Sequence, residues 1–518
     1  MSTLYTNARF WSAGQEIFHE LLVHESEILA VGNDVKNFTA DITIDLQDAF
    51  VIPAFLDGHA HPIFAGREAA GPRINGLNSL AEIKDEVKAF AQANPEAPWI
   101  IGGAYEAAII EGGDFQALWL DEVVHDRPVV LHAVDHHTIW VNTQALQIAG
   151  INAQTKDPEG GTIARNTDGT PKGTLREPSA IALVLNHAPA NTIESDIAAI
   201  KYACAEYRKV GVSAAIDSWC EKDMARAYIA AAHNGDLTIP FNLSFLATPN
   251  TWVEDIDAFN DLRQQAGNLN DPKLLLANSI KFLLDGALSA GTAHLSAPYL
   301  DEPSSSGIAI WENDELLNAL VAFDALGYQV HLHAIGDASV KQALDALESM
   351  QQVNPPWDRR PVIVHAQLIR DEDLSRFAQL GVIANIQPLW CYMDPMNKEL
   401  IAPRIGDERN NRQYRLRSLL NSKAMIAFGS DWPVTSHVPM QALNVPVTRT
   451  NPAAGVTQPW NIEEAITQEE SLTFYTRNVA YQMFRENERG VFEAGKKADF
   501  IVLRSDEIEA IYINGELN

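Results

Sequence analysis

The chain of 518 residues is too long for one ordinary domain, but a barrel of about 250 to 400 residues with a smaller companion domain would account for it. Hydrophobic residues make up 46% and charged residues 20% of the sequence, which are globular proportions and argue against disorder. The formal net charge of −30 argues against nucleic acid and anionic membranes as partners, because both require a basic face.

The cysteine pattern and the N-terminus bear on location. Cys204, Cys220 and Cys391 show neither paired metal-ligand spacing nor a disulfide framework, which fits a reducing compartment. The N-terminus has no basic segment followed by an apolar run, and no later stretch is long enough to span a bilayer. We therefore expect a cytoplasmic protein without a membrane partner. Its oligomeric state stays open, with a homodimer as one candidate.

Both ends of the chain have the texture of small sheets. Short apolar runs alternate with polar turns over residues 3–50, and residues 498–503 and 511–515 repeat this pattern. We predict that residues 1–50 and 485–518 form one small β-domain, a β-sandwich, beside the main domain.

Between the two ends, strand-like runs alternate with helical stretches, as in a parallel sheet whose crossovers are helices. The nine candidate strands cover residues 51–56, 99–103, 128–134, 212–216, 279–284, 328–333, 361–365, 382–386 and 425–428. An eight-stranded barrel requires one of the second and third runs to lie outside it. Residues 80–93 and 313–326 show the spacing of helices packed on a barrel. The sequence thus predicts an α/β protein, a (β/α)8 TIM-like barrel over residues 51–484 with an insertion around residues 141–195.

The first predicted strand leads into a His-x-His pair, His59 and His61. Residues two apart in extended chain point the same way, as two ligands of one metal ion must. His-x-His also occurs by chance in many proteins. Its position at the carboxyl end of a barrel strand, where such barrels place their chemistry, favours a metal site.

Three later strands also end in ligand-type residues, namely His331 and His333, His365, and Asp431. The plainer alternative for each histidine is a buried ring bonded to a carbonyl, and for Asp431 a helix cap. Agreement among four strand ends favours the metal site. His331 and His333 share a face, and we choose His333 as the ligand because it lies nearer the strand end.

Lys281 interrupts an apolar run on what should be an interior strand. An unpaired buried ammonium is costly. One alternative is an ion pair with a carboxylate such as Asp285 or Asp217. The other is a neutral lysine that reacts with carbon dioxide, because a carbamate can bridge two cations.

The order His-x-His, lysine, His, His, Asp resembles the metal-ligand pattern of the amidohydrolase superfamily. The chain is similar to its family 3 branch, which includes N-substituted formamide deformylases, over nearly its whole length. The motifs that carry the resemblance are Pro53-Ala54-Phe55-Leu56-Asp57-Gly58-His59-Ala60-His61-Pro62, Trp140-Val141-Asn142, Asp285-Gly286, Thr292-Ala293, His333-Ala334-Ile335-Gly336-Asp337, Gly429-Ser430-Asp431-Trp432-Pro433 and Gly495-Lys496-Lys497-Ala498-Asp499.

The resemblance implies six ligands divided between two metal ions. These are His59, His61 and Asp431 for the more buried ion, His333 and His365 for the second, and carboxylated Lys281 between them. Zn²⁺, as one or two ions, suits nitrogen-rich ligands. Such an ion lowers the pKa of bound water to about 7 and supplies hydroxide at neutral pH.

Asp431 is the expected proton shuttle from that hydroxide to the departing nitrogen, a role worth roughly 10²- to 10⁴-fold in rate. His333 and Glu177 are alternative proton carriers. Glu177 also matches an acidic position of the family, although a solvated loop carboxylate is an equal alternative.

The chain departs from the family pattern at positions that bear on the substrate. His136 replaces a glycine before His137, Gly291 replaces an arginine, and the run usually ending Gly-Trp-Asp ends Gly103-Ala104-Tyr105-Glu106. The pocket wall should therefore differ from that of relatives. Candidates to line it are Tyr105, Glu106, His137, Trp140, Tyr299 and Trp390, with plain core packing as the alternative for the aromatic residues.

These features predict a metal-dependent hydrolase that cleaves a non-peptide C–N bond of a small-molecule substrate. A deaminase, or a phosphotriester or lactone hydrolase, would use the same site. A non-catalytic barrel is a third alternative, but such proteins tend to lose ligands and this chain retains all six.

Overall fold

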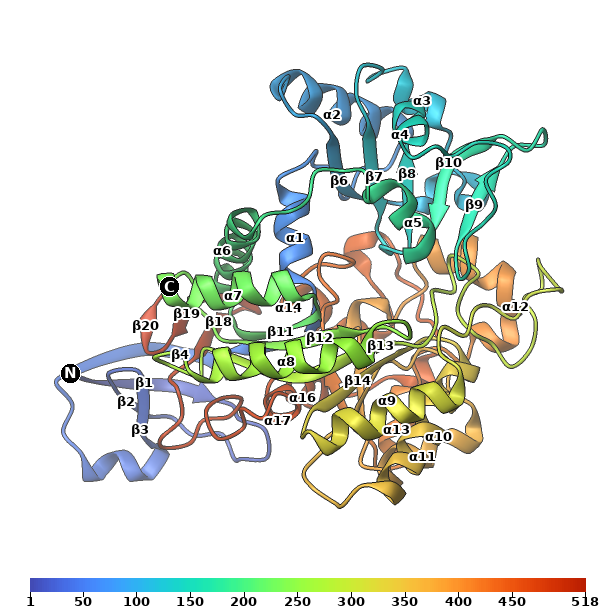
Figure 1. Cartoon of the computed structure of the whole chain (residues 1–518). Helices are drawn as coiled ribbons and strands as arrows, with labels where there is room; N and C mark the ends of the chain where they lie inside the picture. Colours follow the sequence, from blue (N-terminus) through green and yellow to red (C-terminus); the bar gives the residue numbers. More distant parts are fainter.

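Eight parallel strands form the central sheet of the computed structural model, which describes residues 1–518 (Figure 1). In chain order they are β5 (Phe55–Ala60), β11 (Val212–Cys220), β12 (Phe241–Ala247), β13 (Leu275–Leu283), β14 (Gln329–Ala334), β15 (Val362–His365), β16 (Ile383–Ile386) and β17 (Met425–Phe428). Past β17 the chain returns to β5. There the Asp431 N–H donates to the His59 carbonyl at 2.7 Å, and the His61 N–H donates to the Trp432 carbonyl at 2.7 Å. The sheet is thereby nearly closed as a barrel, which confirms the predicted α/β architecture.

Helices cover the outside of this barrel. They are α6 (Ile193–Lys209), α7 (Lys222–Asn234), α8 (Trp252–Gly267), α9 (Asn313–Ala325), α10 (Asp337–Val353), α11 (Leu374–Gln379), α13 (Leu416–Asn421), α16 (Gln468–Tyr475) and α17 (Arg477–Gln482). Their apolar faces share one large core with the strands, in which Phe245, Phe259 and Phe323 pack together. The predicted helix at 313–326 is confirmed as α9.

A second sheet of five strands interrupts the barrel between β5 and β11. Its order is β6 (Ile100–Tyr105), β7 (Val129–Ala133), β8 (Thr138–Val141), β10 (Pro171–Arg176) and β9 (Thr162–Arg165). The helices α2 (Leu80–Ala93), α3 (Ala117–Asp121), α4 (Thr143–Ile148) and α5 (Pro178–Leu185) accompany it. We call residues 71–187 the insertion lobe. The predicted insertion around residues 141–195 overlaps this lobe.

Two predictions about the strands were wrong. Both runs at 99–103 and 128–134 belong to the insertion lobe, whereas only one was expected outside the barrel, and α2 packs on this lobe instead of on the barrel. One of the eight barrel strands, β12, was not predicted. Its run carries Asn242 and Ser244, whose side chains are buried and bonded to the Met483 carbonyl at 2.9 Å and the Ser279 hydroxyl at 2.8 Å. These inward polar residues interrupt the apolar pattern that marks the other strands.

Strands from both chain ends form one seven-stranded sheet, as predicted for the small β-domain. Its order is β20 (Glu516–Leu517), β19 (Glu507–Ile513), β18 (Phe500–Arg504), β4 (Ile42–Pro53), β1 (Ser2–Phe10), β2 (Leu21–His24) and β3 (Glu27–Val31). β18 pairs antiparallel with β4, so that Phe500 lies opposite Pro53. Since β4 leads directly into β5, this sheet is joined to the start of the barrel.

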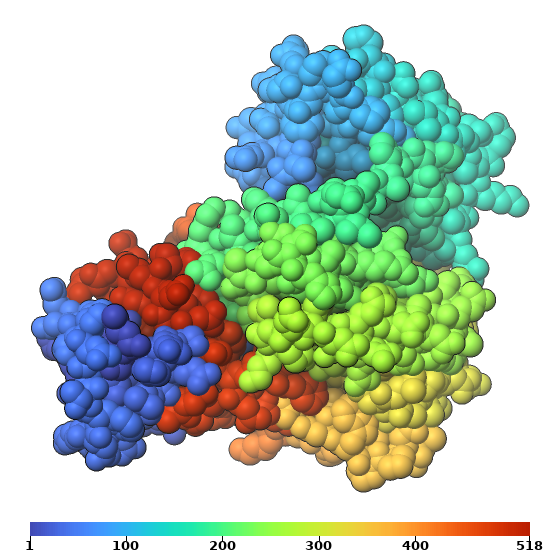
Figure 2. All heavy atoms as spheres, turned by 60° about the vertical axis from the view of Figure 1, so that its left-hand side comes forward, coloured from blue at the N-terminus to red at the C-terminus, as the bar shows by residue number.

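The insertion lobe and the terminal sheet stand on different sides of the barrel. Figure 2 shows the lobe, in blue to teal, projecting from one side, with the N-terminal strands and the red C-terminal segment at another. The remaining helices are α1 (Pro62–Ala69), α12 (Ala402–Asn410), α14 (Pro439–Ala442) and α15 (Val445–Thr448). None of the helices has the length and apolar character needed to cross a membrane.

Candidate metal centre and substrate cavity

The side chains predicted as metal ligands gather at the carboxyl ends of the barrel strands. His59 lies on β5, Lys281 on β13, His333 on β14, His365 at the end of β15 and Asp431 just after β17. All five are at least nine-tenths buried. This end of the barrel is where such folds place their active sites.

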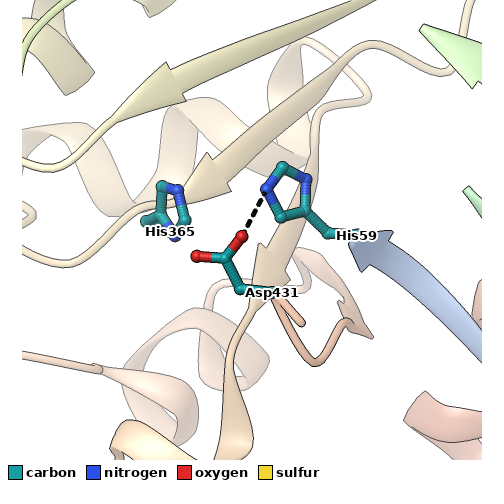
Figure 3. A group of neighbouring side chains, drawn as sticks. All are labelled: His59, His365 and Asp431. Carbon is teal, nitrogen blue, oxygen red and sulfur yellow. Dashed lines mark ion pairs between the residues drawn. The ribbon is translucent and has the colours of Figure 1, made fainter. Parts of the chain in front are cut away.

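His59, His61 and Asp431 converge on one point. The Asp431 Oδ1 atom lies 3.2 Å from His59 Nε2 and 3.1 Å from His61 Nε2. Figure 3 shows the Asp431 carboxylate between the rings of His59 and His365, and the donor atoms of these three residues lie within 4.8 Å of one another. His59 Nε2 and Asp431 Oδ1 are buried and have no hydrogen-bond partner, although they lie so close together. Buried donor atoms that lie this close together without forming hydrogen bonds fit the ligand shell of a metal ion.

The protonation states are those that metal ligands require. Burial, with a contribution from Lys281, lowers the pKa of His59 well below its usual value, so the ring is neutral. Burial opposes the charge of Asp431, but the proximity of His59 and His61 outweighs it and lowers the pKa of this carboxyl well below its usual range. Neutral imidazole and ionised carboxylate bind metal without first losing a proton.

Two glycines allow this convergence. A Cβ atom on Gly58 would lie 2.6 Å from the Phe428 carbonyl oxygen, and one on Gly429 would lie 2.5 Å from the His59 Cβ. No side chain fits at either position. The Asp-Gly-His and Gly-Ser-Asp motifs therefore let β5 and the end of β17 approach closely enough to bring His59 to Asp431.

His333 and His365 form a second group beside the first. Their ring centroids are 4.6 Å apart, and those of His365 and His59 are 5.3 Å apart. Burial lowers the pKa of His333 well below its usual value and that of His365 to about 4. Both rings are therefore neutral, and Trp390 stacks on His365 at 5.2 Å.

A chain of buried amides holds His365. Gln387 accepts the Nδ1–H of His365 at 2.7 Å and donates to Asn385 at 3.1 Å. Asn385 donates to Gln482 at 2.9 Å, and Gln482 donates to the Gly58 carbonyl at 2.7 Å. All three amides are fully buried. This arrangement fixes the tautomer of His365 with Nε2 free, as partners behind a metal-binding histidine do.

The amide chain was not found from the sequence. Asn385 and Gln387 stand two apart at the end of a strand, so their side chains point the same way into the barrel. Two polar residues on the inward face of a buried strand are the signal that would have revealed them.

Lys281 lies among these ligands without an ion pair. Burial lowers its pKa to about 7, and the field of Asp431 only partly opposes this shift. The two carboxylates considered as partners are bonded elsewhere. Asp285 accepts the N–H groups of Ile335 and Gly336 at 3.0 and 2.8 Å, and Asp217 accepts the Tyr228 hydroxyl at 2.8 Å. A lysine with a pKa near 7 has the free amine that carbamate formation requires.

His331, the other histidine on β14, is directed away from the ligand group. Its Nε2 is 3.0 Å from Gln329 Oε1, and burial lowers its pKa to about 3. The ring of His333 instead lies beside that of His365.

Asp57 secures the last strand end against the first. It accepts the Ser430 N–H at 2.8 Å, the His59 N–H at 3.3 Å and the Tyr207 hydroxyl at 3.1 Å. The loop that carries Asp431 is thus tied to the strand that carries His59.

A cavity of about 630 Å³ opens onto the ligand group. Its lining includes His333, His365 and Asp431 from the barrel and residues 75–78, Glu106 and His137 from the insertion lobe. The cavity therefore lies between the lobe and the barrel, and its size suits a small molecule.

The predicted pocket residues divide into two sets. His137, Trp390 and Glu106 line the cavity, and Glu177 is buried behind His137, 2.8 Å from its Nδ1. The prediction was wrong for Tyr105 and Trp140, which are fully buried in the apolar core of the lobe.

Tyr299 was also predicted to line the pocket and does not. It is buried in another apolar cluster, where its hydroxyl donates to the Ala293 carbonyl at 2.7 Å. For these three aromatic residues, core packing is the correct alternative.

The fold and the site together define the class of protein. It is a (β/α)8 barrel whose strand ends carry buried histidines, a lysine and an aspartate, as in barrels that bind metal ions. Comparison with known proteins identifies the family. Residues 43–511 match the model of the amidohydrolase family. The chain is 31% identical to the protein LONG AFTER FAR-RED 3 of Arabidopsis thaliana, over 97% of this chain and 87% of that one.

Two further relatives cover the chain almost completely. It is 26% identical to the N-substituted formamide deformylase of Arthrobacter pascens, over 99% of this chain and 94% of the relative. The crystal structure of an uncharacterized metal-dependent hydrolase from Pyrococcus horikoshii superposes with a TM-score of 0.76 at 23% identity, covering 98% of each chain. The chain belongs to the amidohydrolase family, and the resemblance seen in the sequence is confirmed.

Proposed function

We propose that this chain is a metal-dependent hydrolase that cleaves an amide-type, non-peptide C–N bond of a small molecule. The observation that carries the proposal is the convergence of the unpartnered His59 Nε2 and Asp431 Oδ1 with His61 Nε2, in a buried site that opens onto the cavity. Family membership supports it, and so does the similarity to an N-substituted formamide deformylase.

The residues present fit two divalent cations, with zinc favoured by the nitrogen-rich donors. His59, His61 and Asp431 would hold one, His333 and His365 the other, and a carboxylated Lys281 would lie between them. Such ions, when bound, lower the pKa of coordinated water and polarise a carbonyl oxygen.

Asp431 would move the proton. Its Oδ1 faces His59 and His61, which leaves Oδ2 to accept a proton from water and return it to the departing nitrogen. The leaving amine then departs neutral. Retention of the whole ligand set supports an enzyme over a non-catalytic scaffold.

A substrate panel with metal analysis tests the proposal. Reconstituted protein should carry close to two metal ions per chain and hydrolyse the amide bond of at least one compound in a panel of N-formyl amines, N-acyl amino acids and cyclic amides. His59→Ala should lose metal and turnover, whereas His125→Ala, which removes an exposed histidine, should change neither. Protein that binds no metal after reconstitution would refute the proposal. Cleavage of lactones alone would show that the chain hydrolyses esters instead of amides.

We also propose that the protein works in the cytoplasm on a small-molecule substrate. Three buried cysteines without disulfide bonds support a reducing compartment. Fractionation of the cells that express the protein would test its location.

A further inference from the structure

The wall of the cavity is acidic. Besides the proposed ligand Asp431, the carboxylates of Glu106, Asp135 and Asp394 line it, and none of the lining residues is lysine or arginine. His137 also lines the cavity, and its ring would bring a positive charge when protonated.

Glu177 offsets that positive charge because it lies 2.8 Å from the His137 ring. Burial lowers the pKa of His437, another lining histidine, to about 4 and so keeps it neutral. The three carboxylates therefore face no lysine or arginine in the cavity wall, and the metal ions of the proposed centre would be held by a separate set of ligands on the barrel strands.

Neutral groups supply the hydrogen bonds of these carboxylates. The bonds run from the Ala108 N–H to Glu106 at 3.0 Å, from the His137 N–H and the Ser289 hydroxyl to Asp135 at 3.0 and 2.9 Å, and from the Asn397 N–H to Asp394 at 2.6 Å. These bonds fix the directions of the carboxylates but leave their negative charges unneutralised.

Glu106 also lies within electrostatic reach of the other two carboxylates. Burial raises the pKa of Glu106, and Asp135 adds to the shift. Burial likewise raises the pKa of Asp394 to about 7, with Glu106 contributing. A positively charged group between them would relieve this repulsion, because an opposite charge favours the ionised carboxylate.

A fourth acceptor points to the same kind of ligand. Asn397 lines the cavity and is 3% exposed, yet its side-chain oxygen has no hydrogen-bond partner. Buried polar atoms are normally paired, so an unpaired acceptor in a cavity wall calls for a donor from the ligand. The aromatic rings of Trp390, Tyr392 and Tyr414 line the same space and would favour a cation over their faces.

We infer that the cavity selects amides whose non-reacting part carries a positive charge, recognised by Glu106, Asp135 and Asp394 with Asn397 as a further acceptor. This inference rests on the proposed hydrolysis of C–N bonds and deepens it by naming the substrate class. An ammonium or guanidinium group supplies the N–H donors that these acceptors lack. Substrates with a free carboxylate, including N-acyl amino acids, would meet repulsion instead.

Three matched amides test this selectivity on the metal-loaded protein. They share one acyl group and a benzylic amine whose para substituent is aminomethyl, methyl or carboxylate. We expect kcat/KM to fall at least about tenfold at each step in that order, which corresponds to about 1.4 kcal/mol per step. Binding of the same amides to metal-loaded Asp431→Asn, measured by calorimetry, gives a second readout that needs no turnover.

Variants identify the groups responsible. Glu106→Gln and Asp394→Asn should each reduce the ratio of kcat/KM between the aminomethyl and methyl amides by about tenfold. Glu111→Gln and Glu399→Gln are the matched controls. They remove a charge from the same two segments, but their side chains are exposed and do not line the cavity, so this ratio should not change.

The outcomes separate this inference from the proposed function. Equal turnover of the three amides, or preference for the carboxylate, would overturn the inference and leave amide hydrolysis intact. No turnover with tighter binding of the aminomethyl amide would overturn the hydrolysis and support cation recognition. A loss of metal from Glu106→Gln or Asp394→Asn would show that these carboxylates bind a metal ion, which also overturns the inference.

Discussion

Replacing Gln387 separates what the buried amide chain contributes to folding from what it contributes to metal binding. In Gln387→Leu, the Nδ1–H of His365 loses its acceptor and the side-chain oxygen of Asn385 loses its donor. Each buried polar group left unpaired costs about 1–3 kcal/mol, so the free energy of unfolding should fall by roughly 2–6 kcal/mol. Metal affinity should fall about 10- to 100-fold, because the partner behind a metal-binding histidine orients its ring.

Gln387→Glu should divide these two effects. Its carboxylate still accepts the Nδ1–H of His365, and a carboxylate behind a metal-binding histidine increases the basicity of the ring. Metal affinity should therefore stay at or above that of the wild type. Asn385 still loses its donor, so stability should fall by about 1–3 kcal/mol.

Metal affinity would be measured by competition with a chromogenic chelator, and stability by urea unfolding of metal-free protein. The metal-free form is needed because bound metal adds its own binding energy to the folded state. Gln342→Leu is the control. Gln342 lies on α10, outside the centre, and its side chain makes two hydrogen bonds of 2.8 Å. This control variant should lower stability without changing metal affinity. Equal metal affinities for the leucine, glutamate and wild-type proteins would refute the reasoning.

Three further changes probe the centre and the barrel. Lys281→Ala should lose the second metal and nearly all activity, with partial recovery in acetate or propionate because a small carboxylate can replace the carbamate; unchanged metal content and rate would exclude a carbamate. Asp431→Asn should keep most of its metal while kcat and kcat/KM fall together by at least about 10²-fold, and retained turnover at full metal occupancy would assign proton transfer to another group. Burial raises the pKa of Asp217 from 3.8 to about 7. Between these two pH values the folded chain holds a proton that the unfolded chain has released. The contribution of Asp217 to stability therefore falls as the pH rises from 3.8 to about 7. The melting temperature of Asp217→Asn relative to the wild type should therefore rise from pH 5 to pH 8, and a constant difference would contradict the shift.

The barrel was predictable from sequence because its chemistry marks its strands. An apolar run that ends in His59, His365 or Asp431 identifies both a strand and its carboxyl end. β12 has no such terminal residue and carries Asn242 and Ser244 inward, so neither signal was present. The strands at 99–103 and 128–134 are as apolar as barrel strands, and periodicity does not specify which sheet a buried strand joins.

The sequence identified the candidate ligands, which the fold brings together, but not the residues that support them. Ligand residues are chemically distinctive, whereas Gln387 and Asn385 gain their role only from contacts across strands. Tyr105 and Trp140 were wrongly expected in the pocket because aromatic residues suit both cores and binding sites. The alternation of side chains in β6 decides the matter: Tyr105 enters the core of the lobe, and the next residue, Glu106, faces the cavity.

The cavity depends on hydrogen bonds that hold the insertion lobe on the barrel. The proposed metal ligands all come from the barrel, whereas Glu106, Asp135 and His137 come from the lobe. Asp135 accepts the hydroxyl of Ser289, which follows β13, and Glu177 accepts the hydroxyl of Thr292 in the same loop. The loop that follows Lys281 therefore positions the lobe residues over the centre. Changes in the lobe can then alter which substrate binds, because Glu106, Asp135 and His137 line the cavity while the proposed ligands stand on barrel strands.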